Sequence, residues 1–158
     1  MDRMRVERVY TRDVVATPRT ASLEEAARTM RQFHVGTLVV VDTVRGRQEV
    51  VGIVTDRDLV VRGLAEGADA SHTRVEKVMA PVVASVPEDA ELHEALERMR
   101  AAGVRRLLVT KAGGEPAGIV SLDDAVDGLV AELASLAGLM KSEIAREAAV
   151  PIAERAAD

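Results

Sequence analysis

The chain has 158 residues, of which 47% are hydrophobic and 30% are charged, a composition typical of a folded globular protein. Its net charge of −5 argues against broad nucleic-acid binding, and the absence of cysteine excludes disulfides, thiolate nucleophiles and zinc–thiolate sites. No apolar run reaches the roughly 18 residues of a membrane-spanning helix. The N-terminus leads into no apolar stretch, so we expect a cytoplasmic protein with no signal peptide and no membrane or nucleic-acid partner.

The first half of the chain predicts a strand, a helix, two strands and a second helix. Ser22 and Glu25 have the spacing of a capping box, and apolar residues follow them at helical intervals. Two Val-rich runs bounded by Gly and charged residues predict paired strands joined by a hairpin loop within 43–51. The predicted elements in chain order are a short strand near 14–17, a helix over 22–34, strands over 37–42 and 49–54, and a helix from Thr55.

The second half repeats this order after a short linking helix predicted over 72–79. Met30 recurs 69 positions later as Met99, whereas Gly52-Ile53-Val54-Thr55 recurs only 66 positions later as Gly118-Ile119-Val120-Ser121. The first copy therefore carries three extra residues in its hairpin loop, where insertions cost little. The predicted elements of the second copy are a strand near 82–86, a helix over 91–102, strands over 106–111 and 116–120, and a helix from Ser121.

The repeat divides the chain into two units and a tail. One unit has only about 60 residues, a size at which a lone hydrophobic core is marginal. Packing the two units sheet against sheet would bury the apolar face of each sheet. We therefore expect domains over 6–66 and 72–130, followed by a helical tail over 131–158.

The sequence motifs occur in the same order in both copies. A predicted strand is followed by Pro-x-x-Ala-x-Leu-x-Glu-Ala, which begins at Pro18 and again at Pro87. A Val-rich strand and the segment Gly-Ile-Val-Thr-Asp-Arg-Asp-Leu, at 52–59, complete the set in the first copy. This ordered set covers roughly residues 6–130 and resembles a tandem pair of cystathionine-β-synthase-type (CBS) domains, often termed a Bateman module.

The resemblance implies both a fold and a function. The fold would be α/β (α+β), with two β-α-β-β-α units packed through their sheets around a pseudo-twofold axis, plus a C-terminal helix. Between the units there would be up to two clefts for an adenosine ligand: AMP, ADP or ATP, with S-adenosylmethionine or NAD less favoured. The function would be regulatory and not enzymatic. We expect a stand-alone module that requires no cofactor and acts on an unidentified partner in trans.

Thr55 and Asp58 are the candidate nucleotide-binding pair of the first copy, and Ser121 and Asp124 are their counterparts in the second. Each hydroxyl lies where a strand turns into a helix, an anion-binding position. Each carboxylate one turn later can accept hydrogen bonds from the two hydroxyls of a ribose. The resemblance implies the same roles, phosphate contact for the hydroxyl and ribose contact for the carboxylate. Helix capping alone would also explain this spacing.

Arg105 and Arg106 begin the predicted central strand of the second copy. The resemblance implies that such a basic pair reaches the nucleotide phosphates from the copy opposite Thr55 and Asp58, a role that suits the planar guanidinium. An exposed, solubilising pair is the alternative. The first copy has Gly36 and Thr37 at these positions, which leaves the second cleft short of positive charge.

The purine would lie against apolar residues near the first strand of each copy. Only Tyr10 and Phe33 are aromatic, so adenine would lie between aliphatic side chains and be recognised by backbone hydrogen bonds. The same residues could simply belong to the core. The candidates are Val14, Val15, Ala16 and Val35 from the first copy and Val83, Ala84 and Val104 from the second.

Nothing in the sequence indicates a catalytic or metal site. The three histidines are dispersed, and no carboxylate pair stands out as an acid and a base. Two hypotheses remain: a nucleotide-sensing module, and a structural or interaction protein with empty clefts.

The C-terminal helical pattern is longer than one unit needs. From Ser121, apolar residues recur every three to four positions as far as Ile144, and Pro151 is expected to end the helix. Such a stripe needs a partner surface. It could pack on its own module or on a second chain. The resemblance implies disc-like dimers, so we expect a homodimer, with the contribution of the tail left open.

Overall fold

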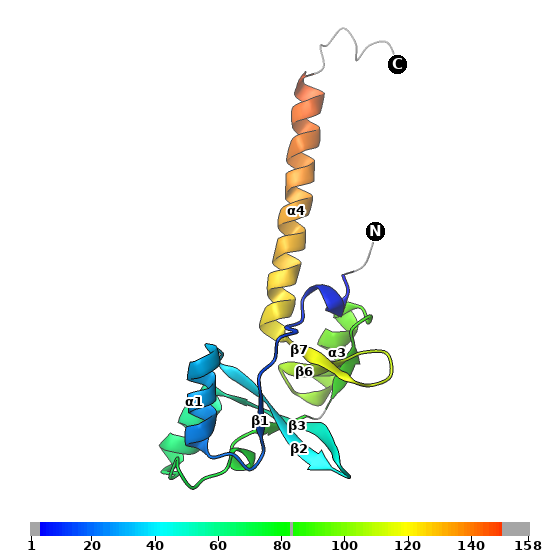
Figure 1. The fold of residues 1–158 in the computed structure, drawn as a ribbon. Helices are drawn as coiled ribbons and strands as arrows, with labels where there is room; N and C mark the ends of the chain where they lie inside the picture. Colours follow the sequence, from blue (N-terminus) through cyan, green and yellow to red (C-terminus); the bar gives the residue numbers. More distant parts are fainter. Residues whose placement is uncertain (1–3, 83, 150–158) are drawn as a thin grey trace.

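The computed structural model describes residues 4–82 and 84–149, which form two packed α/β units and a projecting C-terminal helix (Figure 1). The predicted α/β fold class is confirmed. Val83 and Pro151 lie outside the described residues.

The first unit is built on a four-stranded sheet of order β1-β2-β3-β4. Ser22 caps the first helix through the predicted capping box, since its hydroxyl accepts the N–H of Glu25 at 3.1 Å and the Glu25 carboxylate accepts the N–H of Ser22 at 2.7 Å. The elements are β1 (Ala16–Pro18), α1 (Leu23–Phe33), β2 (Thr37–Val44), β3 (Arg47–Thr55), α2 (Asp56–Asp58), the π-helical turn η2 (Leu59–Gly63), the 3₁₀ turn η3 (Leu64–Glu66) and β4 (Ala80–Pro81).

The second unit has a three-stranded sheet of order β5-β6-β7. Two short 3₁₀ helices precede the units, and the linking helix predicted over 72–79 is reduced to one of them. The elements are η1 (Val6–Arg8), η4 (Val75–Lys77), β5 (Ser85–Pro87), α3 (Leu92–Ala102), β6 (Arg106–Thr110), β7 (Pro116–Ser121) and α4 (Leu122–Ala149).

The hairpin of the first unit differs from the prediction. The sequence predicted a loop within 43–51, but β2 and β3 pair as far as Val44 and Arg47. Only Arg45 and Gly46 form the turn, both with positive φ, as two-residue hairpins of right-handed twist require. The three extra residues therefore lengthen two strands, and the loop prediction is wrong.

The two units share one pairing register. Ala16 on β1 faces Val39 on β2, and Ser85 on β5 faces Leu108 on β6 at the equivalent position. The antiparallel pairs agree as well, and both hairpins show a register shift near the same point of the central strand. The internal repeat read from the sequence is thus a structural repeat.

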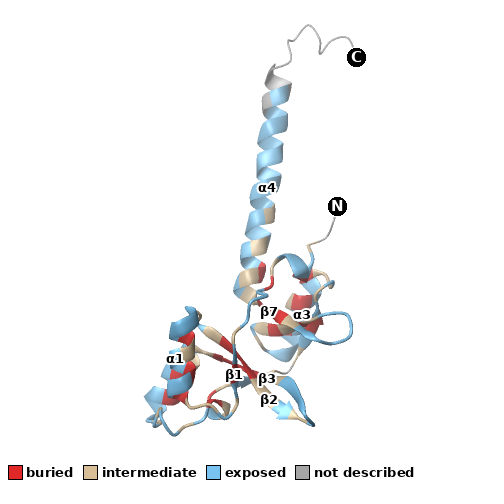
Figure 2. Cartoon of the chain, viewed as in Figure 1, coloured by how far each residue is buried: buried red, intermediate tan, exposed pale blue. Residues whose placement is uncertain are grey.

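The sheets pack against each other through aliphatic side chains. Val39, Ile53 and Ile119 form a buried cluster between the units. Each unit has its own core on the other face of its sheet, as Figure 2 shows beneath α1 and α3. The expected sheet-to-sheet packing is confirmed.

The segment that precedes each unit packs on the other unit. Val6 is fully buried in the core of the second unit, and Val75 is fully buried in the core of the first. The Val6 N–H donates to the Ala90 carbonyl at 3.0 Å, and the Val75 N–H donates to the Ala21 carbonyl at 2.8 Å. These two leading segments, residues 6–10 and 75–79, therefore tie the units together reciprocally.

Glycine is required where each leading segment continues past the opposite sheet. A Cβ on Gly52 would lie 2.9 Å from the Ala80 carbonyl oxygen, and a Cβ on Gly118 would collide with the carbonyl oxygen of Thr11. These glycines let the crossing chain approach β3 and β7 closely. The crossing residues that follow the leading segments, Ala80 and Thr11, line the two clefts described next.

Candidate functional site

A cleft of about 230 Å³ lies between the two units, where β3 ends and β6 begins. We call it the first cleft. Both units contribute to its walls, so anything bound there would contact both. It is lined by Ile53, Thr55, Asp58, Ala80, Pro81, Val82, Ala84, Gly103, Val104, Arg105, Arg106 and Leu108.

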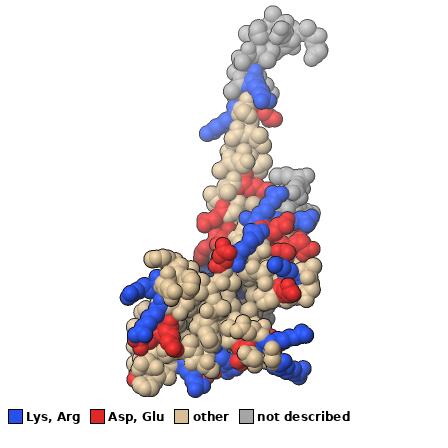
Figure 3. Space-filling model, viewed as in Figure 1, with Lys and Arg blue, Asp and Glu red and all other residues tan. Residues whose placement is uncertain are grey.

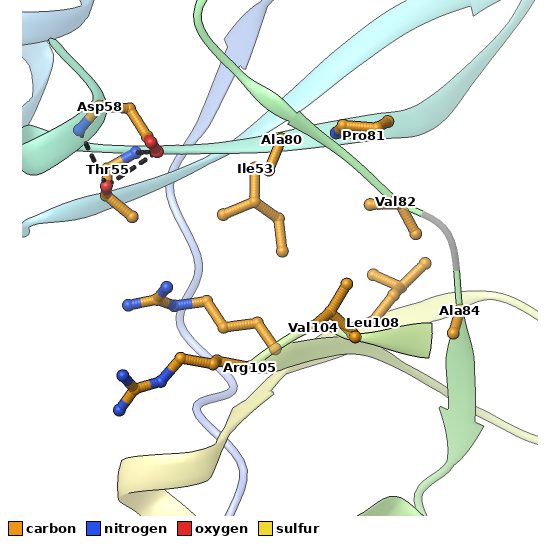
Figure 4. Close-up of a pocket in the computed structure, with 12 residues that line it drawn as sticks. Ile53, Thr55, Asp58, Ala80, Pro81, Val82, Ala84, Val104, Arg105 and Leu108 are labelled. Atoms are coloured by element: carbon orange, nitrogen blue, oxygen red, sulfur yellow. Dashed lines mark hydrogen bonds between the residues drawn. The ribbon is translucent and has the colours of Figure 1, made fainter. Parts of the chain in front are cut away.

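The first cleft has a polar end and an apolar end. Figure 4 shows Thr55 and Asp58 on one wall at the polar end, with Arg105 on the opposite wall. Ile53, Val104 and Val82 lie further along, at the apolar end (Figure 4). This division suits a ligand with a flat apolar ring at one end and an anionic group at the other.

Thr55 and Asp58 form a reciprocal cap at the start of α2. Asp58 Oδ2 accepts the Thr55 N–H at 2.9 Å and the Thr55 hydroxyl at 2.8 Å, while the Asp58 N–H donates to Thr55 Oγ1 at 3.2 Å. Within residues 4–82 and 84–149, no hydrogen bond uses Asp58 Oδ1. Both side chains are half-buried and line the cleft. The interpretation of Thr55 and Asp58 as a helix cap is therefore correct, and it leaves Asp58 Oδ1 available as a hydrogen-bond acceptor.

The two arginines differ in their surroundings. Arg105 Nη2 lies 3.5 Å from Asp123 Oδ1 at the start of α4, and both side chains are largely exposed, so solvent screens this ion pair. Arg106 is half-buried, and none of the described residues forms an ion pair with it. The first cleft therefore has one guanidinium weakly held and a second without an anionic partner in the described chain.

A second cleft of about 270 Å³ occupies the equivalent position on the other side of the sheet interface. Ser121 and Asp124 repeat the cap, with Asp124 Oδ2 accepting the Ser121 hydroxyl at 2.6 Å. Arg106 reaches this cleft too. Its lining residues are Thr11, Asp13, Val14, Val35, Gly36, Thr37, Val39, Arg106, Ile119, Ser121 and Asp124.

The two clefts have opposite charge balance. The first has Arg105 and Arg106 against Asp58, whereas the second has Arg106 against Asp13 and Asp124. Gly36 stands where the second unit has Arg105, as the sequence indicated. An anionic ligand is therefore better matched to the first cleft.

The structure brings most of the predicted site residues into the clefts. Thr55, Asp58, Ala84, Val104 and both arginines line the first cleft, and Val14, Val35, Ser121 and Asp124 line the second. Two predicted residues line neither: Val15 packs against the core of the first unit, and Ala16 lies on β1 at a separate shallow depression.

Sequence reasoning missed Ile53, Ala80 and Val82 in the first cleft. Their counterparts by the repeat, Ile119, Thr11 and Asp13, line the second cleft. The internal repeat could have identified them, because a residue that lines one cleft predicts a lining residue at the equivalent position of the other copy. What the sequence did not reveal is that each leading segment crosses to the opposite unit.

The part of the chain that the structure describes contains no group of three or more His, Asp or Glu side chains that could hold a metal ion. None of its helices combines the length and the apolarity needed to cross a membrane.

A protein-family model described as "CBS domain" matches residues 6–63 and 75–131, well over half of the chain. Among curated proteins, an uncharacterized protein of Methanopyrus kandleri is 34% identical over 119 residues, which cover 75% of this chain and 59% of that protein. The CBS domain-containing protein YhcV of Bacillus subtilis is 32% identical over 119 residues, which cover 75% of this chain and 81% of YhcV.

Solved structures agree with this match. A CBS domain protein of Pyrobaculum aerophilum, complexed with AMP, superposes with a TM-score of 0.63 at 27% identity, covering 77% of this chain and 89% of that chain. An uncharacterized conserved protein of Pyrococcus horikoshii superposes with a TM-score of 0.66 at 27% identity, covering 81% and 94%.

Proposed function

The chain belongs to the CBS domain family, and from this we propose that it is a regulatory module that binds an adenosine nucleotide in the first cleft and signals to a partner protein in trans. AMP, ADP and ATP are the proposed ligands. The AMP complex of the Pyrobaculum aerophilum relative supports this ligand class.

The observation that carries the proposal is the graded lining of the first cleft. The cleft has an apolar end and a polar end, and at the polar end a carboxylate with one oxygen unused in the described chain faces two guanidinium groups of the opposite wall. A nucleotide likewise has an apolar purine at one end and its ribose hydroxyls and phosphates at the other. We assign the purine to Ile53 and Val104, the ribose to Asp58, and the phosphates to Arg105 and Arg106.

Regulation follows from the two-sided construction of this cleft. Asp58 belongs to the first unit, whereas both arginines belong to the second. A nucleotide bound by Asp58 and by both arginines would link the two units. Removing its phosphates would remove the contacts with the arginines and so release the second unit. The relative placement of the units would then report the state of the nucleotide to a partner.

A second candidate function is a structural or interaction module with empty clefts. One observation favours it: the cap fully accounts for the positions of Thr55 and Asp58 without a ligand. Arg106 opposes it, because this half-buried guanidinium lines the cleft without an ion-pair partner in the described chain and is therefore available to a bound anion.

Calorimetric titration of the purified chain with AMP, ADP and ATP, with S-adenosylmethionine and NAD as comparators, tests the proposal. We expect one tight nucleotide site per chain, since only the first cleft combines an acceptor with two arginines. At a ligand concentration about 100 times the dissociation constant, the free energy of unfolding should rise by ~2.7 kcal/mol. Two equivalent sites would contradict the charge argument, and no binding of any adenosine ligand would favour the interaction module.

A further inference from the structure

Helix α4 leaves the body of the molecule soon after it begins. Leu122–Ala149 spans 28 residues, which corresponds to about 42 Å at 1.5 Å per residue. Ala125 is fully buried against the second unit, but most of the helix projects beyond both units (Figure 1). An isolated helix of this kind is marginal in water without a packed face, so the projecting part needs a surface to pack on.

The projecting part carries a regular apolar stripe. Val126, Leu129, Leu133, Leu136 and Met140 follow one another at alternating intervals of three and four residues, the spacing of coiled-coil core positions. Their exposed fractions are between 37% and 66%, and the described part of the chain offers them no cover. Figure 2 shows α4 exposed along nearly all of its length.

The charges along α4 are unevenly distributed. Asp123, Asp124, Asp127 and Glu132 lie in its first half, which has no basic residue. Its basic residues, Lys141 and Arg146, lie in the second half together with Glu143 and Glu147, so the second half carries no net charge. Figure 3 shows several acidic side chains around the base of α4, and both basic and acidic ones toward its far end. Two such helices side by side in parallel would place their acidic halves together, whereas an antiparallel pair would place each acidic half beside a half without net charge and so avoid that repulsion.

We propose that α4 pairs with α4 of a second copy of this chain as an antiparallel two-helix coiled coil. We place the pair in the register in which Leu133 faces the partner's Leu136 and Leu129 faces the partner's Met140, which centres the contact on the projecting part of α4. In this register the four central layers are entirely apolar. The pair would hold two CBS modules at opposite ends of a common helical rod, and this contact does not depend on nucleotide binding.

Engineered cysteines test the orientation, because the chain has no cysteine of its own. Leu129→Cys and Met140→Cys chains should form a mixed disulfide-linked dimer when combined under oxidising conditions, and neither variant should crosslink alone. A disulfide-linked dimer of Leu129→Cys alone would show a parallel pair and overturn the proposal. So would the absence of any crosslink in the mixture.

The mass of the assembly tests whether the stripe is the contact. Replacing Leu133 and Leu136 by Glu should halve the mass measured by light scattering, because charges would enter the centre of the pair. Ala131→Glu is the matched control, since it adds charge to the opposite face of α4. An unchanged mass in the double variant, as expected if the modules associated only through their units, would overturn the proposal, and so would a monomeric wild-type chain. Unchanged circular dichroism would establish that the double variant is folded.

Discussion

Asp58 uses only one of its carboxylate oxygens within the described chain, and this distinguishes capping from ligand binding. Oδ2 accepts two hydrogen bonds from Thr55, so the cap is complete without Oδ1. A ribose diol presents two donors and would need an acceptor in this place. The observed cap and the proposed ribose contact therefore involve different oxygen atoms of Asp58, and a substitution that changes only one of them can separate the two roles.

We expect Asp58→Asn to lower nucleotide affinity about tenfold to a hundredfold with little change in stability. The amide oxygen can replace Oδ2 in the cap, since it is also an acceptor and can take the same hydrogen bonds from the N–H and the hydroxyl of Thr55. The amide N–H₂ then replaces the free acceptor and faces the ribose with a donor. Loss of hydrogen bonds to a charged acceptor costs about 1.5–3 kcal/mol, and 1.4 kcal/mol corresponds to a factor of ten.

Calorimetry on the folded variant is the measurement. Asp124→Asn is its matched control, because it makes the same change at the cap of the second cleft. Unchanged affinity in Asp58→Asn would return Thr55 and Asp58 to a purely structural role.

Arg105 and Arg106 should set the preference for phosphorylated ligands. Replacing both by Ala should weaken AMP and ATP at least tenfold more than adenosine, because charge-assisted hydrogen bonds to phosphate are the stronger ones. Arg57→Ala is a suitable control, since Arg57 lies on α2 beside Asp58 but does not line the first cleft. An equal loss for adenosine and the nucleotides in the double variant would contradict the assignment.

Much of the site was predictable from residue types and the repeat. Thr55, Asp58, Arg105 and Arg106 meet in one cleft because strand ends and helix starts recur at equal offsets. The apolar residues predicted to lie against the purine were less predictable. Val15, which precedes β1, packs against the core of the first unit, and the sequence alone does not say which of several neighbouring apolar residues meets the other unit.

At the scale of elements, the two leading segments are held by different chemistry. Arg19, just after β1, donates to Glu76 on η4 at 2.6 and 2.8 Å and to Asp42 on β2 at 2.9 Å. The repeat places Glu88 and Lys111 where Arg19 and Asp42 stand, so the signs are reversed in the second unit. There, Tyr10 donates to Glu88 at 2.9 Å. Each leading segment is thus matched to one unit only, which disfavours attachment to the wrong one.

Arg19 makes the attachment of η4 sensitive to acid. Its hydrogen bonds hold the pKa of Glu76 and the pKa of Asp42 below their ordinary values. A lowered carboxyl pKa stabilises the fold above the unfolded pKa, roughly 4 for these groups, and that contribution is lost as the pH falls through the folded pKa. We therefore expect the wild type and Arg19→Met to differ in unfolding free energy at about pH 6 and to converge below roughly pH 4.

Urea denaturation of both proteins across this pH range is the measurement. Arg28→Met serves as the control, because Arg28 pairs with Glu24 on the exposed surface of α1, where ion pairs contribute little. A constant difference between Arg19→Met and wild type at all pH values would show that Arg19 acts through packing and not through charge.

For the whole molecule, hydrophobic periodicity and the repeat predicted the number, order and type of most elements. Two features could not be predicted from hydrophobic periodicity and the repeat. The exchange of leading segments depends on long-range packing of short apolar stretches such as Val6–Tyr10, which look alike in both copies. The lengthened hairpin at Arg45 and Gly46 depends on two residues adopting positive φ, which turned an apparent loop into strand.

The exchanged segments also bear on how the chain folds as it is synthesised. The first unit is complete once Pro81 has left the ribosome, because its core needs residues 75–78 and its sheet ends with β4. The second unit needs Val6 and Tyr10, which were made long before the core residue Val86. At ~5–20 residues per second, about 4–16 s of translation separate Val6 from Val86. Throughout that interval the nascent chain displays an apolar segment whose intramolecular binding site does not yet exist. Neighbouring ribosomes on one messenger RNA would then offer completed second units to unfinished chains, a route to segment exchange between molecules.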